Sequence, residues 1–425
     1  MSAPPLALHA YRLASAALAP AAPLVLRARA RNGKEEMARL SERFGKASLL
    51  RPSGQLIWIH GASIGECLSV LPLIRTLLEQ PDRSILVTSG TVTSAALMHE
   101  RLPARAFHQF VPIDTPAAAR RFLDHWRPDI ALFVDSELWP NLLLAAHRRG
   151  TKLALVNGRM SARSFAGWRR APGSARRVLS CFDLCLAQDD TSAERLILLG
   201  AKNVRMSGNL KADVQPEPPD PNMLAAFSRA VGTRPVLLAA STHPGEDETI
   251  LPAHDALRRE YPDLLTIIVP RHPARGGDIA MLCGTRNVVQ RTLAALPEPD
   301  TAVYVADTIG ELSLFYTIAP FAFIGGSLIP HGGQNPMEAA QLGRPVMVGP
   351  YTDNFTDSYE SLLAAQRAGR VCSCADIVAL ARRWLSNAAE ARAAGLAAAH
   401  AAAALGGALE KTHQAVEALC SHAAA

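Results

Sequence analysis

Short, nearly continuous apolar runs alternate with longer amphipathic stretches from residue 56 to residue 208. Apolar runs separated by helix-length segments predict a parallel β-sheet that is covered by helices on both faces. The predicted strands are 56–60 (LIWIH), 84–89 (SILVTS), 130–135 (IALFVD), 153–157 (LALVN), 184–188 (LCLAQ) and 204–208 (VRMSG).

A proline-rich segment with almost no apolar content, residues 211–222 (KADVQPEPPDPN), interrupts this pattern and is predicted to be a linker. The alternation then resumes, and an Ala-rich stretch at 388–409 favours helix. We therefore expect two α/β domains of similar size, with ligand contacts just beyond the carboxyl ends of their strands. Strands of the second domain are predicted at 235–241, 265–270, 302–307, 321–327 and 345–350.

Residues 5–26 are largely apolar, but the run from Leu13 to Leu26 is shorter than the roughly 20 residues that span a bilayer. Basic residues follow it immediately, as they do on the cytoplasmic side of a membrane segment. A signal peptide would instead have its basic residues before the apolar core and a cleavage site after it. This pattern favours a membrane-associated segment, either spanning or interfacial; a helix packed on the protein's own surface is the alternative. The basic residues are Arg27, Arg29, Arg31 and Lys34.

Composition limits the classes of partner. The 425 residues carry 44 Lys and Arg against 38 Asp and Glu, an excess that suits an anionic ligand or membrane surface. Nucleic-acid binding would require basic runs with interleaved aromatics, and aromatics are only 5% of the chain, so we expect no nucleic-acid partner. Seven cysteines without a CxxC pair or zinc-type spacing indicate a reducing compartment and no metal site.

Candidate anion contacts are concentrated in the second domain. Arg271 follows a predicted strand between two prolines, and a guanidinium can form a paired contact with phosphate oxygens. A surface ion pair is the alternative. The stretch STHPGEDE (241–248) fits a helix start, which explains its acids but not His243 or Gly245.

The most specific segment is FIGGSLIPHGGQNPMEAAQLGRPVMVGP (323–350). Gly325-Gly326 ends a strand, where missing side chains would let a ligand approach backbone N–H groups. Asn335 and Pro336 resemble the cap and first residue of a helix, which would direct Asn335 and Glu338 toward a phosphate or ribose. A capping box between Asn335 and Glu338 is the competing interpretation.

The first domain offers a lone carboxylate, Glu66, on the glycine-flanked turn of WIHGASIGE (58–66). An acid in a first helical turn is also favoured by the helix dipole, so both interpretations stay open. Asp135 and Glu137 follow another strand. Lys211 lies at the hinge between the domains, where it could have a functional role or be a solvated surface lysine.

The candidate anion contacts thus fall in the second domain and the lone carboxylate falls in the first. This arrangement suits a transferase in which a carboxylate activates an acceptor hydroxyl and cations compensate the negative charge of the leaving phosphate. We expect a metal-free mechanism because no D-x-D pair of the kind that holds a metal–nucleotide complex is evident.

Eight ordered motifs extend this picture: WIHGASIGE, DSELWPNLL, LVNGRMSARS, GNLKAD, STHPGE, PRHPAR, DTIGEL and FIGGSL…GGQNPMEAA. In these motifs the chain resembles the bacterial 3-deoxy-D-manno-octulosonic acid (Kdo) transferases of lipopolysaccharide synthesis. The resemblance implies an α/β protein of the GT-B type, with two Rossmann-like domains facing each other across a cleft. It implies inverting transfer of Kdo from CMP-Kdo to a lipid A precursor (lipid IVA), with no metal or further cofactor. It also implies a location at the cytoplasmic face of the cell inner membrane.

Site residues are carried over from the resemblance motif by motif. Glu66 would deprotonate the acceptor, and Glu137 and Lys211 would support the transition state. The residues expected to hold CMP are Pro270, Arg271, Ile309, Gly310, Glu311, Asn335, Pro336, Met337 and Glu338. Three positions depart from the usual pattern: Gln334 replaces a histidine, Asp135 replaces a glutamate, and GASIGE replaces AVSVGE.

The resulting domain plan has a membrane-associated segment (1–35), an acceptor-binding domain (36–210), the linker (211–222), a CMP-sugar-binding domain (223–400) and a C-terminal helix (401–425). Two other functions remain: a GT-B transferase for a different nucleotide sugar, and a non-catalytic nucleotide-binding protein. A Rossmann dehydrogenase is disfavoured because no G-x-G-x-x-G follows the first strand.

Overall fold

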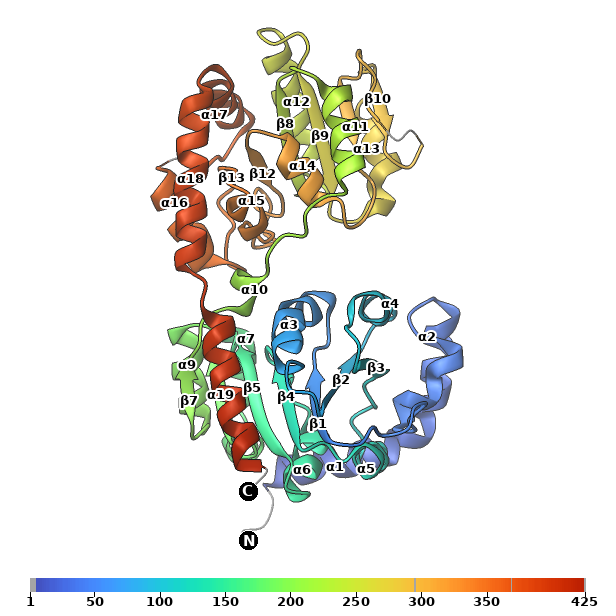
Figure 1. Cartoon of the computed structure of the whole chain (residues 1–425). Coiled ribbons are helices and arrows are strands. Elements are labelled where there is room, and N and C mark those ends of the chain that lie inside the picture. The colour runs from blue at the N-terminus through green and yellow to red at the C-terminus, as the bar shows by residue number, and fades with distance from the viewer. Residues whose placement is uncertain (1–4, 294–295, 368, 424–425) are drawn as a thin grey trace. The chain divides into compact units, whose positions relative to one another are not determined.

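The computed structural model describes residues 5–293, 296–367 and 369–423, which form two compact units (Figure 1). One unit contains the chain up to Val214 together with the segment from Gly406, and the other contains Gln215–Leu405. Each unit is built around a sheet whose strand pairs are all parallel. The predicted α/β class with two Rossmann-like units is confirmed.

Seven strands form the sheet of the first unit, in the order β3-β2-β1-β4-β5-β6-β7. From the interior strand β1 the chain winds outward through β2 and β3, and then returns to the other side of β1 to form β4. All six predicted strands are present; β3 was missed because its sequence, AFHQF, is short and half polar. The strands are β1 (Gln55–His60), β2 (Arg83–Ser89), β3 (Ala106–Phe110), β4 (Ile130–Val134), β5 (Lys152–Gly158), β6 (Leu184–Ala187) and β7 (Val204–Met206).

Both faces of this sheet are buried because alternate side chains of each strand enter different apolar cores. Trp58 packs against Phe122 and Phe133 on one face, with ring centroids 4.9 and 5.0 Å apart. Ile57 and Ile59 enter the core on the other face. The helices are α1 (Leu6–Leu18), α2 (Ala22–Arg31), α3 (Ile64–Leu77), α4 (Val92–Arg101), α5 (Pro116–Trp126), α6 (Pro140–Arg148), α7 (Ala162–Arg169), α8 (Pro172–Leu179), α9 (Asp190–Leu199), α10 (Leu210–Asp213) and α19 (Ala408–Ala423), with 3₁₀ segments at Ala19–Ala21 and Met37–Phe44.

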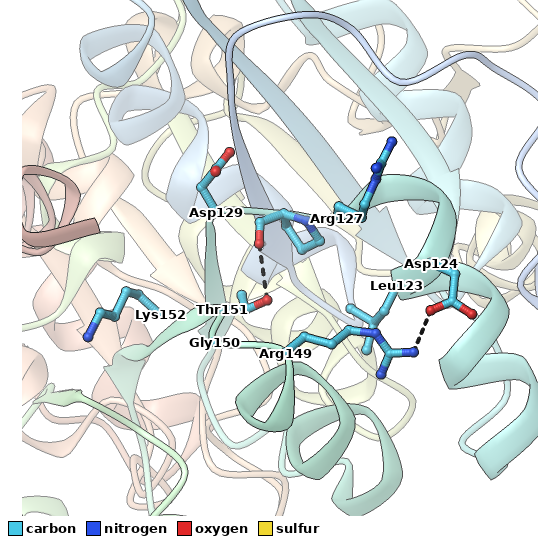
Figure 2. Close-up of a pocket in the computed structure, with 9 residues that line it drawn as sticks. Leu123, Asp124, Arg127, Asp129, Arg149, Gly150, Thr151 and Lys152 are labelled. Carbon is cyan, nitrogen blue, oxygen red and sulfur yellow. Dashed lines mark hydrogen bonds and ion pairs between the residues drawn. The ribbon is translucent and has the colours of Figure 1, made fainter. Parts of the chain in front are cut away.

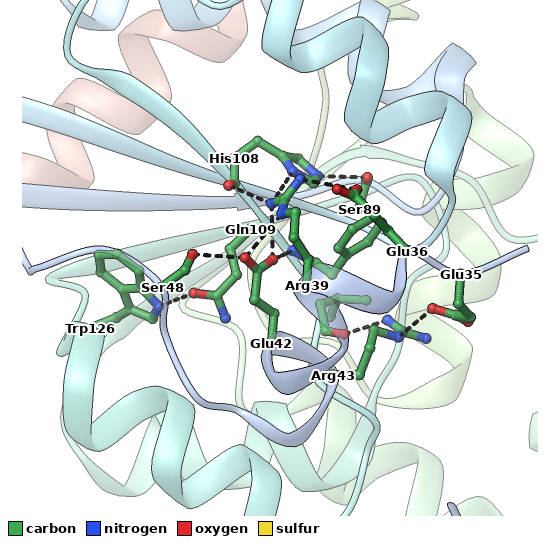
Figure 3. A network of polar contacts seen from close by, with 12 residues as sticks. Glu35, Glu36, Arg39, Glu42, Arg43, Ser48, Ser89, His108, Gln109 and Trp126 are labelled. Carbon is green, nitrogen blue, oxygen red and sulfur yellow. Dashed lines mark hydrogen bonds and ion pairs between the residues drawn. The ribbon is translucent and has the colours of Figure 1, made fainter. Parts of the chain in front are cut away.

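The N-terminal helices are part of the first unit and do not form a separate segment. Leu8 and Leu26 are buried, and the Tyr11 hydroxyl donates to Asp114 (2.8 Å). The following segment is attached to β3 by hydrogen bonds: Arg39 donates to His108 O (3.0 Å; Figure 3), and Glu42, which also pairs with Arg39 (2.9 Å), accepts from the backbone N–H of Phe110 (2.8 Å). Among the described residues, no helix is both long enough and apolar enough to cross a membrane.

Helix α19 returns from the second unit to cover the first. Val416 and Cys420 enter the core that contains Ile57 and Ile59, and Glu417 pairs with Arg83 (2.6 Å). Asp213 fixes the start of this helix, because its carboxylate accepts from the backbone N–H groups of Gly407 (2.7 Å) and Leu409 (2.6 Å). The boundary expected at residue 400 instead lies inside α18, and the chain re-enters the first unit at Gly406.

Six strands form the sheet of the second unit, in the order β10-β11-β9-β8-β12-β13. The five predicted strands are present, and the short edge strand β10 was missed. The strands are β8 (Val236–Thr242), β9 (Leu265–Pro270), β10 (Val288–Gln290), β11 (Val303–Val305), β12 (Ala322–Ile324) and β13 (Val346–Val348). The helices are α11 (Pro221–Val231), α12 (Asp247–Arg258), α13 (Gly276–Leu282), α14 (Leu312–Ile318), α15 (Met337–Gln341), α16 (Thr356–Gln366), α17 (Cys374–Ser386) and α18 (Ala388–Ala404), with a 3₁₀ turn at Pro273–Arg275.

The predicted linker is shorter than expected. Its first residues form α10, which belongs to the first unit, and α11 already begins at Pro221, where Asp220 caps the helix. The stretch without regular structure is therefore residues 214–220.

We expect Asp213→Ala to loosen α19, because two backbone N–H groups at its start lose their acceptor. A lost cap costs about 1 kcal/mol and up to about 2 kcal/mol, so amides of α19 should exchange with solvent roughly five- to thirtyfold faster. Hydrogen exchange measured by mass spectrometry on the peptides of α19 checks this. Asp300→Ala, at an exposed position of the second unit, is the control; unchanged exchange in the Asp213 variant would contradict the capping role.

Candidate functional site

The polar residues predicted for the first unit meet at the carboxyl edge of its sheet. Strands β1 and β4 are neighbours, yet their chains leave toward opposite faces of the sheet: α3 packs in one apolar core and α6 in the other. Ligands of open α/β sheets bind at such a point. Glu66 comes from the segment after β1, Asp135 and Glu137 come from the segment after β4, and α10 brings Lys211 to Asp135.

Glu66 both caps α3 and remains available for chemistry. Ser63 accepts from the Glu66 backbone N–H (3.3 Å), and the carboxylate accepts from the Ser63 hydroxyl (2.7 Å) and the Ala62 backbone N–H (2.7 Å). Glu66 therefore helps to fix the start of α3, in agreement with the interpretation as an acid of the first helical turn. A side chain at Gly61 would lie 3.2 Å from Glu66 Cβ, so the glycine permits this close approach.

The pKa of Glu66 is raised. Burial is the largest cause and outweighs the hydrogen bonds from Ser63 and Ala62, while the negative charges of Glu137 and Asp135 add to the rise. A carboxylate whose pKa is raised is a stronger base than a solvated one.

The pKa of Glu137 is shifted in the opposite direction. Burial alone would raise its pKa, but His60 and the indole N–H of Trp139 lower it below the usual value. Trp139 Nε1 lies 2.5 Å from Glu137 Oε2, and His60 Nε2 lies 3.6 Å from the same oxygen. The pKa values of the two glutamates are thus shifted in opposite directions, the pattern by which acid and base roles in a site are distinguished.

Lys211 is not simply solvated, because its ammonium group lies 3.5 Å from Asp135 Oδ2. Burial raises the pKa of Asp135, against the lowering effect of Lys211 and Arg159. Asp135 also has a backbone φ of 61°, a conformation that non-glycine residues seldom adopt and that often occurs at functional sites. The structure therefore brings together all four polar residues noted in the first domain.

In the second unit, the residues expected to hold CMP come from three places. Pro270 and Arg271 end β9, Ile309–Glu311 follow β11, and Asn335–Glu338 lead into α15. Arg271 is exposed, and among the described residues its guanidinium has no hydrogen bond or ion pair. This cation is free to bind an anion.

The glycine pair after β12 has a different role from the one expected. The buried carboxylate of Glu246 accepts from the backbone N–H groups of Gly326 (2.7 Å), Ser327 (3.0 Å) and Leu328 (3.0 Å). Gly325 donates to Ala240 O (2.8 Å), and a side chain there would come within 2.3 Å of a backbone oxygen. These N–H groups are already satisfied, so the expectation that they face a ligand is wrong: the glycines are required for close packing.

The segment Ile309–Glu311 is partly fixed by its own acid. Glu311 accepts from Arg291 (2.5 and 3.0 Å) and from the Thr308 hydroxyl (2.5 Å), and the pairing with Arg291 lowers its pKa. Ile309 is 84% exposed, and Gly310 has a φ of 86°. The acid therefore holds the turn in shape, and the turn presents an apolar side chain and backbone groups to solvent.

Asn335 and Glu338 behave differently from each other. Asn335 Oδ1 accepts from the backbone N–H of Met337 (3.1 Å), so it caps the short helix, which begins one residue later than expected. Glu338 does not complete a capping box, since among the described residues its carboxyl group has no hydrogen-bond partner. Burial, together with the negative charge of Glu217, raises the pKa of Glu338 to about 7.

Sequence reasoning missed the partners that tune these acids. His60 and Trp139 lie in the motifs WIHGAS and ELWP, but their roles depend on neighbouring strands that bring them to Glu137. Glu246 lies in STHPGEDE, whose acids were attributed to a helix start. Its role depends on β8 and β12 being adjacent.

A pocket of about 530 Å³ lies at the opposite end of the first sheet, where β4 and β5 begin (Figure 2). None of the predicted site residues lines it. Two of its three cations have acidic partners: Arg149 pairs with Asp124 (2.5 Å) and Lys152 pairs with Asp183 (3.4 Å). The candidate site is therefore at the carboxyl edges and not in this pocket.

Two Rossmann-like units with polar residues at their carboxyl edges define a protein of the GT-B fold. The UDP-GlcNAc 2-epimerase of Neisseria meningitidis, solved with bound UDP-GlcNAc, shares the fold: the TM-score is 0.59 at 15% identity, over 86% of this chain and all of that one.

Residues 38–214 match the protein family described as 3-deoxy-D-manno-octulosonic-acid transferase (kdotransferase). The 3-deoxy-D-manno-octulosonic acid transferase of Haemophilus influenzae is 35% identical over 83% of this chain and 84% of its own length. That of Bordetella pertussis is 36% identical over 96% and 98% of the two chains. The chain belongs to the Kdo transferase family of glycosyltransferase enzymes, as its motifs predicted.

We expect the stability of the second unit to fall as pH rises from 5 to 8, with Glu338 as one cause. In the unfolded chain Glu338 loses its proton near its ordinary pKa of 4.5, whereas in the folded unit it does so near 7. Between these values the folded state binds more protons, so increasing pH favours unfolding.

Denaturant unfolding of wild type and Glu338→Gln across this pH range checks the direction of the change in stability. The difference between the two free energies of unfolding isolates the contribution of the Glu338 carboxyl group. Glu360→Gln, at an exposed position of the same unit, is the control. A wild type that gains stability over Glu338→Gln with increasing pH would rule out the assignment.

Proposed function

We propose that the protein transfers Kdo from CMP-Kdo to a hydroxyl group of a lipid A precursor, lipid IVA, with inversion and without a metal ion. The observation that carries the proposal is the pair of glutamates with oppositely shifted pKa values at the carboxyl edge of the first sheet. An inverting transfer requires one base for the acceptor hydroxyl, and Glu66 has the raised pKa that such a base needs.

The reaction then proceeds in one displacement. Glu66 takes the proton of the acceptor hydroxyl as its oxygen forms a bond to the anomeric carbon of Kdo, and the bond from that carbon to the phosphate oxygen breaks. CMP leaves with the bonding electron pair. Ionised Glu137 stabilises the positive charge that develops on the sugar, and Lys211 with Arg271 compensates the negative charge on the leaving phosphate.

The nucleotide would be held by the second unit. The free guanidinium of Arg271 suits the phosphate. The carboxyl group of Glu338, which has no hydrogen-bond partner in the part of the chain that the structure describes, suits the ribose hydroxyls, since a ligand donor would complete its hydrogen bonding. Asn335, the exposed Ile309 and the backbone of Gly310 would contact the remainder of CMP.

The N-terminal helices would bind the cytoplasmic face of the inner membrane, from which a lipid acceptor must arrive. Large apolar side chains on α1 and α2 remain exposed, including Leu6, Leu13 and Leu24. Such surfaces next to Arg and Lys residues suit an anionic lipid interface.

These helices are also connected to the candidate site. Asp114, which accepts from Tyr11, accepts from the backbone N–H groups of Asn141 (3.0 Å) and Leu142 (2.9 Å) in the first turn of α6. Glu137 lies shortly before that helix, which begins at Pro140. A membrane-bound α1 would therefore be held at the carboxyl edge where the acceptor reacts.

We expect Glu66→Gln to abolish transfer while its affinity for CMP stays near that of wild type, because the amide keeps the shape but cannot take a proton. The assay is mass spectrometry of lipid IVA after incubation with CMP-Kdo, alongside calorimetric titration with CMP. Glu79→Gln, at an exposed position at the end of α3, should transfer normally. Loss of CMP binding in Glu66→Gln would remove Glu66 as the base; a folded wild type that adds no Kdo would overturn the proposed function.

We expect the double variant Leu13→Glu, Leu24→Glu to bind vesicles of phosphatidylglycerol and phosphatidylethanolamine at least about tenfold more weakly than wild type, since each buried leucine contributes about 1.5–3 kcal/mol. Vesicle co-sedimentation measures this. Leu396→Glu, which alters an exposed leucine of the second unit, is the control. Equal sedimentation of the double variant and wild type would refute membrane binding through these helices.

A further inference from the structure

Three histidines gather at the carboxyl edge of the second sheet. His243 follows β8, His272 follows β9 and His331 lies beyond β12, and these three strands are neighbours. The His243 and His331 rings are 4.1 Å apart between centroids at an interplanar angle of 39°, and the His243 and His272 rings are 6.2 Å apart. None of the three histidines takes part in the proposed proton transfer or in the proposed contact with the phosphate.

The local backbone allows the His243 and His331 rings to lie close together. Gly326 has a φ of 69°, and a side chain there would lie 3.1 Å from His331 Cδ2 and 3.4 Å from His243 Cδ2. Gln334 Nε2 lies 3.0 Å from His243 Nε2, and an amide NH₂ group can only donate. His243 Nε2 is therefore the acceptor, and the ring proton is on Nδ1, where it can be donated.

The acids nearby are already engaged. Glu246 accepts from four backbone N–H groups, including that of His243 (2.9 Å), and Asp247 pairs with Arg275. Glu248 accepts from the backbone N–H of Gly245 (3.0 Å). The histidines therefore form a donor-rich group with no matching carboxylate assigned to them.

The electrostatic environment at this group is positive. The pKa of His243 falls to about 4, chiefly through burial and then through the positive charges of His331, His272, Arg271 and Arg275. His243 is therefore uncharged at neutral pH, and it lies in the field of the positive charges of Arg271 and Arg275. Neutral N–H donors close to such guanidinium groups suit an anionic ligand.

A nucleotide-activated octulosonic acid presents two separate anions: the phosphate of the nucleotide and the carboxylate of the sugar acid. We infer that the three histidines bind the carboxylate of the donor sugar, leaving Arg271 to bind the phosphate. This inference rests on the proposed function. Within it, Gln334 is a positioning residue that keeps His243 in the tautomer that donates from Nδ1.

The test separates the two anions by comparing a ligand that has both with one that lacks the carboxylate. We expect His331→Ala and His272→Ala, both at exposed positions, to raise KM for CMP-Kdo at least about tenfold while Ki for CMP as a competitive inhibitor changes less than about twofold. Arg271→Ala should raise Ki for CMP by roughly tenfold or more, as expected for a charged hydrogen bond. His400→Ala, an exposed histidine of α18, is the matched control and should change neither constant.

Three outcomes would overturn the inference. A parallel rise in KM and Ki in the histidine variants would assign the cluster to the phosphate. Unchanged constants in both variants would leave the cluster with a packing role only, a conclusion supported further if the variants lose thermal stability. A wild type that binds CMP but uses a different sugar donor would overturn the proposed function, and the inference with it; a wild type that transfers Kdo leaves only the histidine assignment in question.

Discussion

Both units depend on one constraint of parallel sheets: the chain leaves the carboxyl ends of two neighbouring strands in opposite directions. In the first unit this happens at β1 and β4, and in the second at β8 and β12. Helices cannot close the space directly above such a point, so side chains there are partly removed from water and still accessible. That intermediate environment produces the shifted pKa values of Glu66 and Asp135, for which burial is the largest cause.

Two similar motifs show how strongly the surroundings determine what an acid does. SIGE, ending at Glu66, and HPGE, ending at Glu246, each follow the first strand of their unit. Glu66 is half-buried and accepts from one hydroxyl and one backbone N–H, so it can still exchange a proton. Glu246 is fully buried and accepts from four backbone N–H groups, which makes it a structural anion.

The sequence was sufficient for the strands that form the buried centre of each sheet, because their apolar runs are long and uninterrupted. It was insufficient for β3 and β10, which are short edge strands that contain polar residues. It also misplaced the C-terminal helix, since the cap that Asp213 supplies comes from nearly 200 residues away.

For the candidate site, local motifs identified Glu66, Glu137, Lys211, Arg271 and Glu338, yet they could not distinguish a ligand contact from a packing contact. Gly325 illustrates the limit. A glycine at a strand end is compatible with a ligand or with a neighbouring backbone, and only the proximity of Ser241 O decides between them.

The position of α19 has a consequence for how the protein is made. The core around Ile57 and Ile59 is completed by Val416 and Cys420, which are synthesised only after the whole of residues 215–405. At the usual rates of translation this interval lasts roughly 10–40 s. During that time the apolar face around Ile57 and Ile59 lacks the cover that α19 supplies in the folded chain.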